Sequence, residues 1–329
     1  MPSKSKLLMP ILGGVLILLV VLMVVASQQE GPTFTPPVPP QNNGYDQLLE
    51  AAKLLAPRTG FYDEMDDQEL AKIVEQNRQV LELVDTALKQ PIMVPVDWSA
   101  KPGSAGSLRL NDWTATRSIA RALAAQARWQ RLNGEHRAAL DSAGKIYQLG
   151  ANCARGGLLN DYLVGLAVLG LGLDELRRLD PTDSKAMEAA LETVASHRED
   201  LEHAYDVIER EKAYIRANAS GFVCWQMRRN LDSMFDASAQ GGFAAERRLA
   251  AQQNLLWLHL ALHLYHLEQG AWPTSLDDLP TVRQPQSLLD PFSNQPFVYR
   301  LTADSYQLYS VGENSIDDGG QTDEYGLQP

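Results

Sequence analysis

Apolar residues recur three or four positions apart through most of this chain, from Tyr45 to about Gly270. This spacing is the period of an α-helix that buries one face, and clusters of Pro and Gly mark the breaks between helices. We expect about seven helices, because the breaks divide the periodic region into that many segments. Helices with an apolar stripe must pack against one another. Residues 45–242 are therefore predicted to form an α-helical domain of hairpins or a bundle.

Short connections and glycines indicate how some of these helices pack. Two of them flank Asn133-Gly134, a short connection typical of an antiparallel pair, although the pair matches a tetratricopeptide repeat only weakly. In the most apolar helix, Gly165, Gly170 and Gly172 would let neighbouring helices approach closely. The predicted helices span residues 66–89, 116–133, 136–149, 158–173, 184–218 and 243–269, with a loop over residues 91–110.

Residues 7–26 form an uncharged and strongly apolar run. A helix of this length rises about 30 Å, which is the thickness of the hydrocarbon core of a bilayer. We therefore expect a tail over residues 1–6, a transmembrane anchor over residues 7–27 and an extended, proline-rich linker over residues 28–44. A cleaved signal peptide is the alternative, since Val24-Val25-Ala26 ends the run, but the run exceeds the usual length of such a segment.

The distribution of basic residues predicts the orientation of the anchor. Lys4 and Lys6 precede the apolar run, whereas the first basic residue after it is Lys53. The positive-inside rule then places the N-terminus in the cytoplasm and everything after the anchor on the other side of the membrane. The expected location is the bacterial inner membrane, with a single span and the body of the protein in the periplasm.

The composition narrows the range of partners. The chain has 41 acidic and 29 basic residues, and its formal net charge of -12 argues against nucleic acid as a partner. Its two cysteines, Cys153 and Cys224, form no CxxC motif and have no nearby His, so a redox or zinc motif is not indicated. Outside the cytoplasm they could pair, and the spacing leaves open a disulfide or two buried thiols.

The C-terminal region carries a distinctive series of segments. Alternating residues over 297–299 and 305–310 predict two strands, paired as a hairpin through residues 302–304. Gly270 is suited to end the preceding helix in the left-handed conformation. The segments that follow are Trp272-Pro273-Thr274, Asp290-Pro291-Phe292, Tyr309-Ser310-Val311-Gly312 and Asp317-Asp318-Gly319-Gly320, in that order.

Over residues 250–325 this order of segments resembles the globular head of the major pseudopilin of type II secretion. The resemblance implies a small helix-plus-antiparallel-sheet module, assigned to residues 243–325, and so an α+β fold for the whole chain. It also implies a non-catalytic role and protein partners in secretion or pilus-like machinery. The chain lacks the processing site that pseudopilins carry before their hydrophobic helix, so a minor fibre subunit stands as an alternative.

In that family a Ser-x-Gly loop binds calcium, and the matching loop here is rich in oxygen donors. Calcium takes six to eight oxygen ligands from carboxylates, amides and main-chain carbonyls. Asn stands here at the position where the family usually has Asp. The resemblance therefore implies a structural calcium ion, held by the carbonyl of Val311 and the side chains of Asn314, Asp317, Asp318 and Asp323.

Three histidines suggest a different function. His259, His263 and His266 recur at positions i, i+4 and i+7, so they project from one face of a helix and could converge on a metal ion. A metal-dependent hydrolase is therefore the alternative, although no HExxH motif is present and the many leucines account for the helix as a core element. The sequence contains no nucleophile elbow, P-loop or dinucleotide fingerprint. The main expectation is a membrane-anchored, non-catalytic interaction or scaffolding protein.

Overall fold

The computed structural model describes residues 34–57, 62–100, 104–180, 182–196, 201–218, 222–280, 289–302, 305–320 and 325–327. Within them the chain forms eight α-helices, a 3-10 helix and a three-stranded antiparallel sheet, so the predicted α+β class is confirmed. The helices are α2 (Tyr45–Lys53), α3 (Asp67–Leu88), α4 (Ser104–Leu132), α5 (His136–Cys153), α6 (Leu159–Arg177), α7 (Ser184–Ser196), α8 (Ala204–Asn218) and α9 (Phe222–Gln269). They are followed by η1 (Leu276–Asp278), β1 (Val298–Leu301), β2 (Tyr306–Ser310) and β3 (Tyr325–Leu327).

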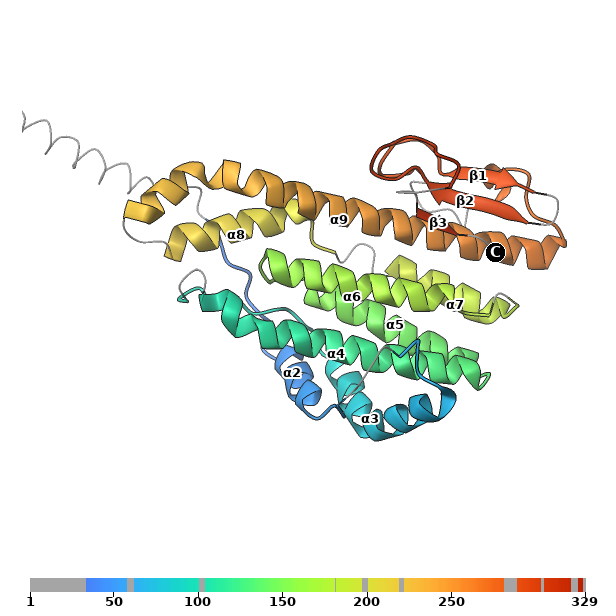
Figure 1. Ribbon diagram of the computed structural model, residues 1–329, viewed down its shortest axis with the longest axis horizontal. Coiled ribbons are helices and arrows are strands. Elements are labelled where there is room, and N and C mark those ends of the chain that lie inside the picture. Colours follow the sequence, from blue (N-terminus) through green and yellow to red (C-terminus); the bar gives the residue numbers. More distant parts are fainter. Residues whose placement is uncertain are drawn as a thin grey trace, which may run out of the picture.

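Helix α9 is the longest element and extends along most of the molecule (Figure 1). Helices α6, α7 and α8 pack along it, while α2, α3 and α4 lie on the side of α5 and α6 away from α9 (Figure 1). The sheet covers the opposite side of α9, near the C-terminal end of that helix (Figure 1). The helical body and the sheet therefore share α9.

Glycines allow α5 and α6 to pack at very short range. A Cβ atom added at Gly165 would lie 2.4 Å from the backbone nitrogen of Ala154, and one at Gly172 would lie 2.6 Å from that of Tyr147. The predicted role of these two glycines is confirmed. For Gly170 the prediction is wrong, because a Cβ there would meet only a side-chain atom 3.9 Å away.

Two buried carboxylates on α6 tie the body together. Asp161, which is 3 % exposed, accepts hydrogen bonds from Arg109 Nε at 2.9 Å and from Trp113 Nε1 at 2.7 Å, both on α4. Glu175, in the last turn of α6, accepts hydrogen bonds from the hydroxyl of Tyr62 at 3.0 Å and from Arg131 Nη1 at 2.9 Å. Each carboxylate therefore links segments that are distant in the sequence.

The predicted helix over residues 184–218 is wrong, because the structure has two helices there. Helix α7 ends at Ser196 and α8 begins at Ala204. The backbone N–H of Ala204 donates to Glu246 Oε2 at 3.0 Å, so a side chain from α9 satisfies the free start of α8. Such a tertiary cap leaves no local pattern in the sequence.

Three other boundaries also differ from those predicted. The final helix begins at Phe222 instead of Phe243 and passes through Gly241-Gly242 without a break. Gly242 is buried, and a Cβ there would lie 3.6 Å from Ala204 and Leu159, so tertiary packing offsets the low helix propensity of glycine. Helix α4 begins at Ser104, inside the predicted 91–110 loop, and α5 continues past residue 149 to Cys153.

The predicted tail and anchor, and the first part of the linker, lie outside the described residues. Among the residues that the structure does describe, no helix is long and apolar enough to cross a membrane. Cys153 is a buried free thiol whose pKa is raised to about 12 by burial. The side chain of Cys224 lies outside the described part.

Candidate functional site

The C-terminal module begins where α9 stops. Gly270 adopts a φ of 71°, and its N–H donates to the carbonyl of His266 at 2.8 Å, so the predicted left-handed stop is confirmed. The turn that follows is fixed to the sheet, because the hydroxyl of Tyr299 donates to the carbonyl of Pro273 at 2.7 Å. The chain therefore reverses direction at a defined point and returns over α9.

A short 3-10 helix then fills the space beneath the sheet. Ser275 and Asp278 cap η1 reciprocally, and the hydroxyl of Thr274 donates to Asp278 Oδ2 at 2.8 Å. Leu276 and Leu279 are buried in the core that α9 shares with the sheet.

The sheet has the strand order β1-β2-β3, and both pairs are antiparallel. Val298 lies opposite Tyr309, and Leu301 lies opposite Tyr306, which confirms the predicted hairpin. Strand β3, which the sequence did not predict, adds Leu327 opposite Leu308. One face of β2 is buried against α9, and this contact holds the module on the helical body.

A buried carboxylate joins two segments of the C-terminal series. Asp290 is 1 % exposed, and its Oδ1 accepts from the hydroxyl of Ser310 at 2.9 Å and from the N–H of Phe292 at 3.0 Å. Its Oδ2 accepts from the N–H of Val311 at 2.9 Å. The hydroxyl oxygen of Ser310 in turn accepts from the N–H of Gly312 at 3.1 Å, where φ is 70°. The Asp-Pro-Phe turn and the Ser-Val-Gly loop are therefore one hydrogen-bonded unit.

The three histidines of α9 lie against aromatic side chains of the module. His259 Nδ1 and the hydroxyl of Tyr306 form a hydrogen bond of 2.7 Å. The ring of His266 stacks on Trp272 at 4.2 Å, and His263 meets the same indole edge-on at 5.1 Å. We call these five residues the aromatic–histidine cluster. They form the contact between α9, the turn and β2.

The environment of the cluster keeps two histidines neutral. Burial lowers the pKa of His259 to about 3, with a further contribution from the neighbouring His263. Burial also lowers the pKa of His263 to about 4. Within the described part of the chain, no three His, Cys, Asp or Glu side chains are arranged to hold a metal ion. The rings of His263 and His266 pack against Trp272.

Four of the five predicted calcium ligands lie on the described part of one loop. Val311 directly follows β2, and its N–H donates to Asp290 Oδ2. The side chain of Asn314 accepts from the N–H of Ile316 at 2.9 Å and donates to Asp318 Oδ2 at 3.3 Å. The fifth predicted ligand, Asp323, lies outside the described residues.

The remaining predicted ligand, Asp317, is already engaged by protein donors. Its Oδ1 accepts from the hydroxyl of Tyr309 at 2.8 Å, and its Oδ2 accepts from Arg300 Nη2 at 2.6 Å. The hydrogen bond from Tyr309 lowers the pKa of Asp317, and so does the hydrogen bond from the N–H of Gly319. In this arrangement the guanidinium of Arg300 pairs with the carboxylate that would bind calcium.

One ion pair and one cation–ring contact connect the outer loops of the module to α9. Arg248 Nη2 lies 2.5 Å from Glu313 Oε1, and the guanidinium of Arg247 lies 5.8 Å from the centre of the Phe292 ring. The ion pair is exposed, so it contributes little to stability.

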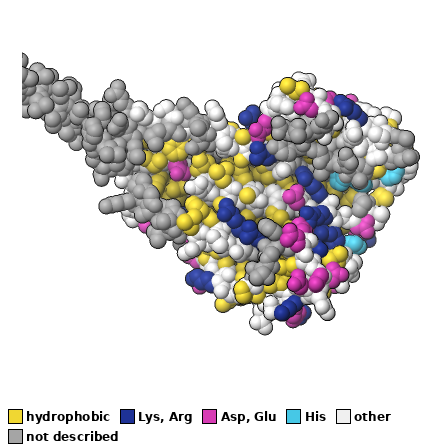
Figure 2. Space-filling model, viewed as in Figure 1, with side chains coloured by type: hydrophobic (Ala, Val, Ile, Leu, Met, Phe, Trp, Pro, Cys, Tyr) yellow, Lys and Arg dark blue, Asp and Glu magenta, His cyan; other side chains and the backbone are white. Residues whose placement is uncertain are grey.

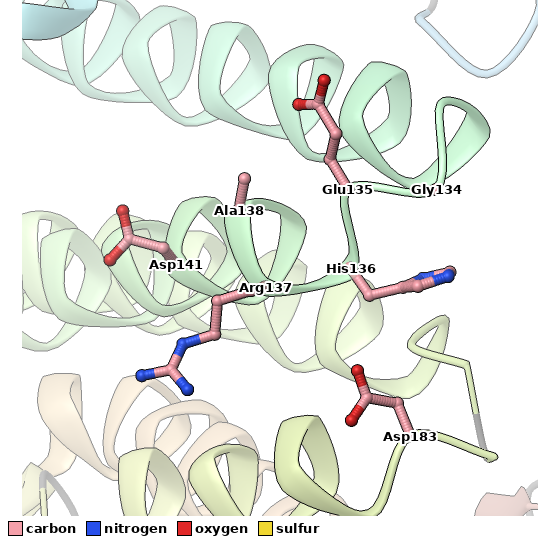
Figure 3. A pocket seen from close by; sticks show the side chains of 7 residues that line it. All are labelled: Gly134, Glu135, His136, Arg137, Ala138, Asp141 and Asp183. Atoms are coloured by element: carbon pink, nitrogen blue, oxygen red, sulfur yellow. The ribbon is translucent and has the colours of Figure 1, made fainter.

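A separate pocket lies at the turn between α4 and α5 (Figure 3). It is open, with a volume of about 670 Å³, and its charged side chains point in different directions (Figure 3). Asp183 caps α7 through the N–H of Ala186 at 3.0 Å, and His136 Nε2 lies 3.7 Å from Asp180. These side chains have structural partners and do not converge on a common point. The lining residues are Gly134, Glu135, His136, Arg137, Ala138, Asp141 and Asp183.

In comparisons with known proteins, the chain matches no family model, no curated protein and no solved structure. Its function is therefore argued from its own residues. The feature that sequence reasoning missed is the role of Asp290. The Asp-Pro pair was visible as a turn, but its bond to Ser310, twenty residues later in the chain, has no local signal.

Proposed function

We propose that this protein is a single-pass protein of the bacterial inner membrane whose body lies in the periplasm. It acts as a non-catalytic interaction or scaffolding protein, and its C-terminal module contacts components of secretion or pilus-like machinery. The observation that carries this proposal is the buried carboxylate of Asp290, which joins the Asp-Pro-Phe turn to the Ser-Val-Gly loop. These are two of the segments on which the resemblance to the pseudopilin head rests.

The form of the module supports the same proposal. A three-stranded antiparallel sheet packs on the end of a long helix, as the resemblance implies. The polar groups of the module are used to fix turns: Ser310 is bonded to Asp290, and His259 to Tyr306. The rim exposes the large apolar side chains Leu301 and Ile316, which are suited to a protein partner.

Two steps test the proposal in a bacterial host that produces the full chain. Carbonate extraction and protease treatment of spheroplasts should show a membrane-bound protein whose body is cleaved from the periplasmic side. A photo-crosslinking amino acid at Ile316 should then give discrete adducts with secretion or pilin-like proteins. The same group at Leu83, which is exposed on α3, is the matched control. A soluble protein, or equal adducts at both positions, would contradict the proposal.

Calcium enters this proposal as a structural ion of the 311–323 loop. To bind it, Asp317 would have to exchange Arg300 for the ion, which thermal unfolding can detect. We expect the midpoint to rise in calcium relative to chelator and the increase to disappear in Asp317→Ala/Asp318→Ala. If calcium changes nothing in the wild-type protein, Arg300 fixes this loop alone.

One observation favours the metal-dependent hydrolase as a second candidate. Within the described part of the chain, His263 Nε2 and His266 Nδ1 are buried without a hydrogen-bond partner. A zinc titration followed by calorimetry discriminates the two functions, with His263→Ala as the control. Stoichiometric binding that His263→Ala abolishes, together with turnover of an ester or peptide, would replace the scaffolding role. The fibre-subunit alternative predicts processing, so an intact Met1 on membrane-extracted protein contradicts it.

A further inference from the structure

The described end of the proline-rich linker is attached to the body at two points. We call residues 34–43 the strap. At one end, the ring of Phe34 stacks on Trp98 with 5.6 Å between ring centres. At the other end, Asn43 Nδ2 donates to the carbonyl of Met93 at 2.7 Å, and Asn43 Oδ1 accepts from the N–H of Met93 at 3.1 Å. The strap therefore follows the 93–98 loop instead of standing away from the body.

The strap reaches the body beside α8. Trp98 meets Tyr214 edge-on at 5.8 Å, and the hydroxyl of Tyr214 donates to the carbonyl of Ala100 at 2.7 Å. Tyr214 lies one turn before the end of α8, close to the point where α9 begins. Figure 1 shows the strap, in blue, starting beside α8, while the sheet lies at the opposite end of α9.

Chain length limits how far this end can lie from a membrane. If residues 7–26 span the bilayer, the chain from Ala26 to Phe34 can extend no more than about 28 Å, at roughly 3.5 Å per residue. The module is much further along the molecule. From Phe222 to Leu258, which packs against the sheet, a helix rises about 54 Å at about 1.5 Å per residue.

Part of the visible face is apolar. Figure 2 shows apolar side chains gathered on the side of this face near α8, whereas charged side chains are more frequent over its middle. Val38 on the strap is 83 % exposed, and Phe34 is 37 % exposed. Aromatic and apolar side chains suit the interface of a bilayer, and mixed charges suit water.

We infer that the end of the body where Phe34, Trp98 and Tyr214 meet faces the lipid surface, and that α9 holds the module about 50 Å further from it. The strap fixes this orientation because it is attached at both ends. This inference rests on the anchor of the proposed function and adds the surface that lies against the lipid. The module is then presented to partners away from the membrane.

Energy transfer to lipids tests this orientation. The full chain, with Cys224→Ser to leave only the buried Cys153, is reconstituted in phosphatidylcholine vesicles that carry an acceptor dye on some headgroups. A donor dye is attached at Ser99→Cys in one sample and at Ile316→Cys in the other, both at exposed positions. We expect transfer from position 99 to exceed that from position 316 at least threefold. Phe34→Ala/Trp98→Ala should reduce this ratio, whereas Leu83→Ala on α3 should not.

Two different failures can be distinguished by floating the vesicles before the measurement. A chain that does not float with the vesicles has no anchor, which overturns the proposed function and this orientation together. A chain that floats but shows equal transfer from both positions, or stronger transfer from position 316, overturns the orientation alone. An unchanged ratio in Phe34→Ala/Trp98→Ala would show that the strap does not set it.

Discussion

The helical body and the C-terminal module are stabilised in different ways. In the body, buried carboxylates on α6 bind side chains of α4, and glycines on α6 pack closely against α5. The stabilising contacts are therefore spread over several helices. The module shares a small core with α9, and Asp290 makes the buried hydrogen bonds between its turn and its loop. A change at this one residue should therefore loosen the module and leave the body folded.

The largest effect is expected in the body. Asp161→Ala removes the partner of a buried guanidinium, Arg109, and should lower the free energy of unfolding by about 3–5 kcal/mol. Denaturant unfolding of the whole chain measures it. Asp174→Ala on the same helix, where the carboxylate is half exposed and bound to Arg177, should cost under about 1 kcal/mol. Equal losses in the two variants would remove the distinction between buried and exposed pairs.

The next effect should be confined to the module. Asp290→Ala leaves the hydroxyl of Ser310 and the N–H of Val311 without their acceptor, which should cost about 3 kcal/mol locally. Limited proteolysis should then cut within residues 289–320 and spare α3 to α6. Asp277→Ala, an exposed acid in the same module, is the control and should leave the pattern unchanged. Cleavage throughout the body would show that the two regions unfold together.

A smaller change in stability should distinguish two glycines of α6. Gly165→Ala forces a Cβ against the backbone of Ala154 and should destabilise the protein by about 2 kcal/mol. Gly170→Ala has room for its methyl group and should be neutral or stabilising by up to about 1 kcal/mol, since Ala favours helix. Thermal unfolding of the pair decides, and a similar loss in both would contradict the close packing of α5 on α6.

A further prediction is a pH dependence of the contact between α9 and β2. His259 and His263 have pKa values of about 3 and about 4 when folded, well below the ordinary value of 6.5. The unfolded chain therefore takes up protons first, and stability falls as the pH drops from 6.5 towards 4. The slope should be at most about 1.4 kcal/mol per pH unit for each histidine. His263→Phe, which keeps a ring against Trp272, should flatten the slope.

His203, in the helical body, should show a dependence of stability on pH that is opposite in sign to that of His259 and His263. Its pKa is raised by the hydrogen bond with Glu246, so the pair contributes at low pH and loses its effect as the pH rises through the folded pKa. His203→Asn should therefore remove the stabilisation gained as the pH falls to 6.5 and leave the slope between pH 6.5 and 4 unchanged. A changed slope below pH 6.5 in that variant would contradict the assignment of charge to this pair.

The sequence predicted those features of the fold that are local. The stop at Gly270 is confirmed by its positive φ, and the predicted hairpin by the antiparallel pairing of β1 with β2. Both follow from a few neighbouring residues. The break between α7 and α8 and the continuous start of α9 depend on packing between distant segments, and no local pattern encodes them.

In the candidate site, too, local features could be predicted and contacts between distant residues could not. The hairpin and the buried positions of Leu276 and Leu279 could be predicted from alternation and turn residues. The bond between Asp290 and Ser310, and the Arg300 side chain on Asp317, could not, because each joins residues that are far apart in the chain. Side-chain type alone suggested a cation at Asp317, whereas the fold places an arginine there.

Hydrogen exchange measured peptide by peptide on the full chain tests most directly whether the module is a separable unit on an independent body. In Asp290→Ala, peptides that cover residues 289–320 should lose protection, while those of α3 to α6 keep the wild-type rates. In Asp161→Ala, the body should lose protection. Unchanged exchange over residues 289–320 in Asp290→Ala, or a uniform loss across the whole chain, would contradict the account.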